Sequence, residues 1–208
     1  MFQKKPGYLF DGVDLCVEEG SKVCILGYNG VGKSSLLRLL AKAEAPTEGT
    51  IHHASGISIG YWDADLLKRR VQNHGASTSL KYLQDKYGNR TEQDLRSELT
   101  SFGLAPHQIT RPIHYLSGGE QTRLALVDLM LNDPPVLLLD NPTCHLDVES
   151  VEALTYGLQR WKGTVVMVSH DASFLRVLDV QCYVLTEKEG KLRRLEGGMD
   201  MYLKHFKY

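Results

Sequence analysis

In the first third of the chain, the spacing of apolar residues changes from that of a strand to that of a helix and back. Residues Ser21 to Leu26, SKVCIL, form a short apolar run typical of a buried strand, and it stops at a glycine-rich segment. From Leu36, the sequence LLRLLAKA has apolar residues at helical spacing until the breaker Pro46-Thr47-Glu48-Gly49. The next segment, TIHHASGISIGYW, alternates in the manner of strands and turns. This region therefore predicts strand, loop, helix and further β structure.

The pattern changes in the middle of the chain. From Asp65 to about Pro112, polar and amphipathic segments such as STSLKYLQDKYG and TEQDLRSELTSFG predict an inserted helical subdomain at about residues 65–115. Ser117 is then placed to cap a helix over residues 117–131, which the sequence Asn-Asp-Pro-Pro ends.

The last third returns to strands. Two β-rich runs, VLLLD and TVVMVSH, flank the helical pattern VESVEALTYGLQRW, and a parallel strand pair needs such a crossover helix. The segment CYVLTEKEGKLRRLEGG predicts a hairpin that turns at Glu189-Gly190. The predicted fold class is α/β, with a mostly parallel sheet core and an inserted helical subdomain.

Composition places the chain among ordinary globular proteins. Its 208 residues suffice for one domain, residues 1–208, with a full core. Apolar residues make up 42% and charged residues 24%, which excludes the disordered and fibrous classes. The net charge of −1 gives no overall attraction to nucleic acid or acidic membranes. We see no signal peptide and no apolar run near the ~18 residues of a membrane span, so we expect a cytoplasmic protein.

Cysteine and histidine spacing does not indicate a zinc site. The four cysteines form no metal-binding pattern, and His52-His53 has no acid or thiol partner at ligand spacing. We expect free thiols.

A glycine-rich loop follows the first predicted strand. Its sequence fits G-x-x-x-x-G-K-[ST] in a strand-to-helix context. Glycines allow backbone N–H groups to turn toward an anion, and the helix N-terminus adds positive potential. We therefore expect Lys33 to reach the β- and γ-phosphates of a nucleotide and the Ser34 hydroxyl to meet magnesium. The residues that fit this pattern are Gly27, Tyr28, Asn29, Gly30, Val31, Gly32, Lys33 and Ser34.

Two further segments complete this chemistry. The run Leu137 to Asp140 ends in an acid at the carboxyl end of a parallel strand, the edge where such sheets bind ligands, so Asp140 is the expected magnesium-side carboxylate. The sequence LSGGEQ, Leu116 to Gln121, leads into a helix and offers a second set of N–H groups for phosphate.

The order of these motifs resembles an ABC ATPase nucleotide-binding domain. The phosphate loop, LSGGEQ before RLAL, LLLDNPTCHLD and VVMVSHDASFL occur in that order. Within that superfamily, PTCHLD, SHDASFL and the closing EGGMDMYLKHF resemble the ABC-F class of tandem-domain proteins without a transmembrane domain, and TEQDLRSELTSFGL is similar to the second domain of eukaryotic members.

The resemblance implies a role for each motif. It implies an ABC-type P-loop NTPase fold that binds ATP with Mg²⁺. Residues Gly27 to Ser35, Ser35 included, would hold the triphosphate, and Ser34 and Asp140 would hold the metal. It implies that His145 to Asp147 cross the seam between two such domains and that His170 is the switch histidine near the γ-phosphate. The residues that would contact ATP bound to the partner domain are Ser117, Gly118, Gly119 and Glu120.

Asn141 departs from the family pattern at the position of the water-activating glutamate. Asparagine can orient a water molecule by hydrogen bonding but cannot take its proton. Loss of such a group typically lowers the rate by about 10²–10⁴. We therefore expect binding to survive, hydrolysis to be impaired, and the site to close on ATP and reopen slowly.

Two other segments also differ. Counting along IGYWDADL places Ala64 where the family has the Q-loop glutamine, with Asp63 or Asp65 as substitutes. The opening MFQKKPGYLF leaves Phe2 or Tyr8 as the candidates for stacking on adenine, and the chain resembles one domain of a longer tandem protein.

Three functions compete on this pattern. The leading one is ATP-dependent pairing with a second ABC domain, in a homodimer or a tandem protein, coupled to a ribosome- or translation-related task. The alternatives are a non-hydrolytic scaffold that ATP regulates, and the ATPase subunit of a transporter; the weak Q-loop and the ABC-F-like tail count against the latter. The basic clusters Lys68–Arg70 and Lys191–Arg194 are interpreted as solvated surface.

Overall fold

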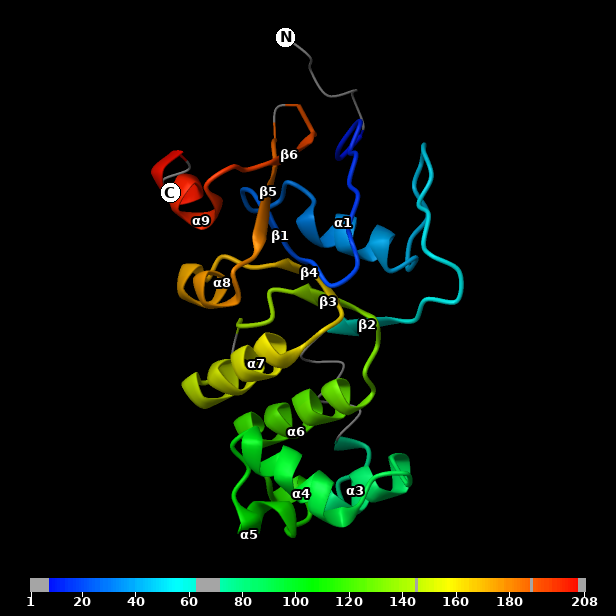
Figure 1. Cartoon of the computed structure of the whole chain (residues 1–208), viewed down its shortest axis with the longest axis vertical. Coiled ribbons are helices and arrows are strands. Elements are labelled where there is room, and N and C mark those ends of the chain that lie inside the picture. Colours follow the sequence, from blue (N-terminus) through cyan, green and yellow to red (C-terminus); the bar gives the residue numbers. More distant parts are fainter. Residues whose placement is uncertain (1–7, 63–71, 145, 188, 206–208) are drawn as a thin grey trace. The chain divides into compact units, whose positions relative to one another are not determined.

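The computed structural model describes residues 8–62, 72–144, 146–187 and 189–205 (Figure 1). The chain forms two compact units, which we describe separately. The sheet unit comprises residues 1–61, 135–142 and 162–208, and the helical unit comprises residues 62–134 and 143–161.

The sheet has six strands in the order β2-β3-β4-β1-β5-β6. Strand β4 pairs in parallel with both β1 and β3, β1 pairs in parallel with β5, and β5 pairs antiparallel with β6. The predicted α/β class with a mostly parallel sheet is confirmed, as is the terminal hairpin. The strands are β1 (Lys22–Leu26), β2 (Ile59–Trp62), β3 (Val136–Asp140), β4 (Thr164–Val168), β5 (Gln181–Leu185) and β6 (Leu192–Arg194).

Alternate side chains of the central strands supply the core of the sheet unit. Val23 and Ile25 of β1, with Leu138 of β3, pack with Leu36 and Leu37 of α1 (Lys33–Leu40). The residues between them, such as Cys24, are also fully buried, so both faces of the strands exclude water. Helix α9 (Gly198–His205) packs against β5 and against α8 (Ala172–Leu178).

Helix α1 is shorter than its apolar pattern predicts. It ends at Leu40 because Lys42 adopts a left-handed conformation with φ of 55°. The N–H of Ala43 donates to the Arg38 carbonyl over 2.9 Å, which satisfies a terminal carbonyl as a C-terminal capping motif does. The alternating segment after it forms a strand only at its end, in β2.

The helical unit consists of short capped helices around a leucine-rich core. Side chains of Thr78, Thr91, Ser117 and Asp147 accept a backbone hydrogen bond at the starts of α3, α4, α6 and α7. Ser117 therefore caps the helix that the sequence places after it. The elements are α3 (Ser79–Lys86), α4 (Glu92–Ser101), α5 (Pro106–Ile109), the 3-10 helix η1 (Ile113–Tyr115), α6 (Gly118–Leu131) and α7 (Val148–Arg160).

A buried carboxylate ties α3 to α6. Asp128 of α6 accepts from Lys86 Nζ at 2.6 and 2.7 Å and from the Tyr82 hydroxyl at 3.0 Å. The Tyr87 hydroxyl donates to the Asp128 carboxylate and to its carbonyl. Burial and the Asp128 charge raise the pKa of Tyr87, so this hydroxyl stays a donor.

No helix within the described residues is long and apolar enough to cross a membrane.

We predict that Asp128→Ala lowers the free energy of unfolding by about 2–4 kcal/mol, because two tyrosine hydroxyls and an ammonium lose their acceptor. Urea denaturation followed by far-UV circular dichroism measures this loss. Asp85→Ala is the matched control, since Asp85 pairs with Lys81 on the exposed face of α3 and should cost less than about 0.5 kcal/mol. Equal losses in the two variants would contradict the assignment.

Candidate nucleotide-binding site

The loop between β1 and α1 has the backbone conformation that an anion nest requires. Gly27, Gly30 and Gly32 have φ of 148°, 81° and 107°. A Cβ at Gly27 would lie 2.7 Å from the Leu185 carbonyl oxygen, so this position has no room for a side chain. Such residues allow successive N–H groups to converge on phosphate. Of the other loop residues, Val31 is buried in the core, while Tyr28 and Asn29 are exposed.

Lys33 is buried at the start of α1 and bonds to its own loop. Its Nζ donates to the carbonyl oxygens of Gly27 at 2.8 Å and Tyr28 at 2.9 Å. Burial lowers the pKa of Lys33, and the negative charge of Asp140 opposes this shift. The ammonium therefore lies among oxygen atoms that a phosphate group would supplement or replace.

The two predicted magnesium ligands are in contact. The Ser34 hydroxyl donates to Asp140 Oδ1 over 3.1 Å, joining the first turn of α1 to the end of β3. A hydroxyl and a carboxylate are oxygen ligands that Mg²⁺ accepts, and it usually completes its shell with phosphate oxygens and water. These two residues fit that arrangement. Among the described residues, no group of three or more His, Cys, Asp or Glu side chains offers a separate metal site.

Asn141 donates to the same carboxylate oxygen as Ser34. Its Nδ2 donates to Asp140 Oδ1 over 3.2 Å, and its backbone N–H donates to the Val168 carbonyl over 2.8 Å. Its φ is 44°, a left-handed conformation that asparagine tolerates better than most residues. The side chain at the expected water-activating position is thus an amide that binds Asp140.

His170 follows β4, which neighbours both β1 and β3. Burial lowers its pKa, and the positive charge of Lys33 adds to the shift. The imidazole is therefore neutral near pH 7 and able to hydrogen-bond without adding charge. The structure brings His170, Lys33 and Asp140 to one edge of the sheet.

The LSGGEQ segment lies in the helical unit. Ser117 Oγ accepts from Glu120 N at 3.2 Å, and the Glu120 carboxylate accepts from Ser117 N at 2.6 Å, which forms a capping box. Gly118 and Gly119 are the first residues of α6. A Cβ at Gly119 would lie 2.0 Å from Asp147 Oδ2, so a side chain there would displace the Asp147 carboxylate.

Several residues that the sequence singles out lie outside the described part of the chain. They are Phe2, Asp63, Ala64, Asp65, the cluster at Lys68–Arg70 and His145. Tyr8, a candidate for adenine stacking, donates its hydroxyl to Glu48 Oε1 over 2.7 Å.

Sequence reasoning missed the side chains nearest to the phosphate loop. A Cβ on Gly32 would lie 2.7 Å from Leu9 Cδ2 and 3.1 Å from Phe10 Cδ1. Phe10 also packs against the core of the sheet unit. No local motif marks these residues, because their position depends on packing across the sheet unit.

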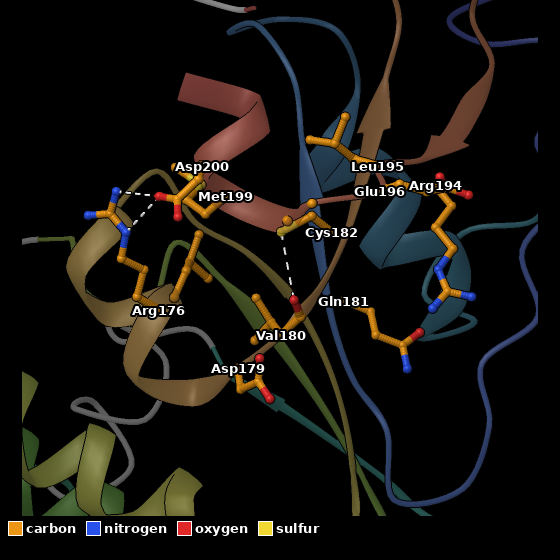
Figure 2. A pocket seen from close by; sticks show the side chains of 13 residues that line it. Arg176, Asp179, Val180, Gln181, Cys182, Arg194, Leu195, Glu196, Met199 and Asp200 are labelled. Atoms are coloured by element: carbon orange, nitrogen blue, oxygen red, sulfur yellow. Dashed lines mark hydrogen bonds and ion pairs between the residues drawn. The ribbon is translucent and has the colours of Figure 1, made fainter. Parts of the chain in front are cut away.

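A separate hollow in the sheet unit is not part of this site. It has a volume of about 690 Å³ and lies between α8, β5, the segment after β6 and the start of α9 (Figure 2). At its rim, Arg176 and Asp200 face each other in an ion pair of 2.6 Å. None of its lining residues belongs to the phosphate loop or to the Asp140 and His170 region.

The phosphate loop, the strand acid and the capped LSGGEQ helix together define the ATP-binding domain of an ABC protein. The sequence profile of the ABC transporter family matches residues 10–144, and the chain belongs to this family.

Relatives specify the class. The chain is 34% identical over 194 residues to ATP-binding cassette sub-family F member 3 of Rattus norvegicus, an alignment that covers 93% of this chain and 27% of that protein. It is 34% identical over 201 residues to the putative ATP-binding protein YdiF of Bacillus subtilis, covering 97% of this chain and 30% of that protein. The resemblance to the ABC-F class is confirmed, and the chain spans about a quarter to a third of these relatives.

Solved structures share the fold. The dimeric ATP-binding cassette MJ0796, in a post-hydrolysis state with ADP and Pi, has a TM-score of 0.64 at 25% identity, covering 94% of this chain and 96% of that one. RNase-L Inhibitor has a TM-score of 0.66 at 26% identity, covering 90% of this chain and 37% of that one.

We predict that binding of Mg-ATP takes up protons at alkaline pH below 10.5, the ordinary lysine value, because phosphate raises the lowered pKa of Lys33 and ATP itself is fully ionised there. Isothermal titration in two buffers of different ionisation enthalpy measures the uptake. His170→Asn should keep it, since the imidazole is neutral in both states at this pH. Binding without proton uptake would show that Lys33 does not meet the phosphates.

Proposed function

We propose that residues 1–208 form one ABC domain that binds Mg-ATP, pairs through it with a second ABC domain, and hydrolyses it slowly. The observation that carries this proposal is the arrangement around Asp140 Oδ1. Ser34 and Asn141 both donate to this oxygen, which supports a metal side formed by Ser34 and Asp140 next to an amide side chain.

The phosphate half of the proposal uses the sheet unit. Gly27 to Ser35 would surround the triphosphate, with Lys33 against the β- and γ-phosphates, and Ser34 and Asp140 would hold Mg²⁺. The metal would neutralise charge on the phosphate oxygens. Neutral His170 would hydrogen-bond the γ-phosphate or the attacking water.

The pairing half uses the start of α6. The capping box engages the N–H groups of Ser117 and Glu120, so those of Gly118 and Gly119 would meet the γ-phosphate held by the partner domain. The Ser117 hydroxyl would add a hydrogen bond. The Glu120 carboxylate repels phosphate and would have to turn away from it when the domains pair.

The slow step would be activation of water. Asn141 can hold a water molecule but cannot remove its proton, and its amide is already directed at Asp140. ATP would therefore keep the two domains together for longer than in a site with a glutamate.

By its resemblance to ABC-F proteins, we propose a ribosome- or translation-related task for the paired state. This step rests on the family relationship alone. Sedimentation of the chain with ribosomes, in Mg-ATP but not in Mg-ADP, would support it. ATP-dependent pairing without ribosome binding would favour the scaffold function instead, and binding to a membrane subunit would favour the transporter function.

We predict that Asn141→Glu raises steady-state ATP turnover at least about 10-fold, because a carboxylate restores a general base. A phosphate-release assay measures this. Glutamate in the left-handed conformation costs about 1 kcal/mol, so each variant is assayed below its melting temperature. Asn141→Gln is the matched control, since it has the same length and backbone strain but no basic oxygen. No gain in the Glu variant, or rapid turnover in the parent chain, would refute impaired hydrolysis.

A further inference from the structure

Arg123 is a buried cation between the starts of two helices of the helical unit. It lies on the second turn of α6 and has 4% of its surface exposed. Its Nη1 is 3.0 Å from Glu149 Oε2 and 3.5 Å from Asp147 Oδ1. Asp147 caps α7 and Glu149 lies in its first turn, so one guanidinium contacts both acids at this helix start.

The same helix start is packed against the phosphate-binding end of α6. Asp147 Oδ2 occupies the space that a side chain at Gly119 would need. Ser150 donates its hydroxyl to the Gly119 carbonyl over 3.4 Å and its N–H to Asp147 Oδ1 over 2.8 Å. The Ser150 hydroxyl, and more weakly Arg123, lower the pKa of Asp147, so the acid is charged at neutral pH.

Stability alone does not account for Arg123. Farther along, α6 and α7 already pack closely, since a Cβ on Gly157 of α7 would lie 3.1 Å from Met130 Cε of α6. The Arg123 Nε is buried and makes no hydrogen bond within the described part of the chain, and both acids it pairs with are more than half exposed. An apolar residue of similar volume avoids the cost of desolvating a guanidinium. Arg123 instead fixes the distance between the start of α6 and the start of α7.

We infer that Arg123 is a positioning residue that holds Asp147 against Gly119. Asp147 is the last residue of the loop that is expected to cross the seam between two domains. The phosphate-contacting end of α6 and the start of α7 then move as one element when a partner domain binds. This inference rests on the proposed function, in which the start of α6 and the start of α7 both face the ATP bound to the partner domain.

Four variants of the full chain test this coupling. Arg123→Met removes the charge and keeps the volume, Arg123→Lys keeps the charge but cannot reach both acids, and Glu149→Gln removes one ion pair. Lys86→Met is the matched control, because it breaks the other ion pair of α6, at Asp128, away from the phosphate-binding end. The readouts are melting temperature, affinity for a fluorescent ATP analogue, Mg-ATP-dependent pairing by analytical ultracentrifugation, and amide hydrogen exchange.

We expect Arg123→Met to weaken pairing at least about 10-fold while analogue affinity stays within about twofold, since the phosphate loop is untouched. Exchange at residues 119–121 and 149–151 should rise together, Arg123→Lys should recover part of the pairing, and Glu149→Gln should fall between parent and Arg123→Met. Lys86→Met should lose stability without this pattern.

Unchanged pairing in Arg123→Met, or an equal loss in Lys86→Met, would overturn the inference. If the parent chain itself does not pair with Mg-ATP, the proposed function fails, and hydrogen exchange then decides the inference alone. Separate exchange behaviour of the two helix ends would overturn it in that case.

Discussion

Parallel strand pairing is the constraint on which the nucleotide site depends. Because β1, β3 and β4 are paired in parallel, their carboxyl ends lie at one edge of the sheet. The phosphate loop after β1, Asp140 at the end of β3 and His170 after β4 therefore meet there, although the loop precedes the other two by more than 100 residues in the sequence. The buried strands fix the position of this edge, and the segments that follow them provide the side chains and backbone N–H groups of the site.

Burial at this edge sets the electrostatics of the site. Lys33 is held in a low-dielectric place with loop carbonyls as partners, and its charge helps to keep His170 neutral. Asp140 is the opposing negative group, and it is already shared by two donors. A triphosphate with magnesium would place further negative oxygen atoms beside Lys33, and the proton uptake that we predict on binding follows from this change in its surroundings.

Linear motifs made much of this predictable. The strands β1, β3 and β4, the capped start of α6 and the terminal hairpin follow from local sequence. The positions of Lys33 and Ser34 at the start of α1, and of Asp140 at the end of β3, follow from it as well. The early end of α1 at Leu40 could not be foreseen, because its cause is a left-handed lysine rather than a glycine. Contacts between distant segments were also hidden: Leu9 beside Gly32, Asp147 against Gly119, and the guanidinium of Arg123 between two acids.

Asn141 shows where sequence and structure each contribute. The sequence places asparagine where the family resemblance implies a water-activating acid, but only the structure shows that the amide binds Asp140 from a left-handed backbone. Asparagine suits this conformation, so the residue is compatible with its backbone as well as with a binding role. Under the proposed function, such a site would lack the proton acceptor while Asp140 stays oriented by Asn141. Slow turnover and retention of ATP would then be two consequences of one side chain, and this position would control the lifetime of the paired state.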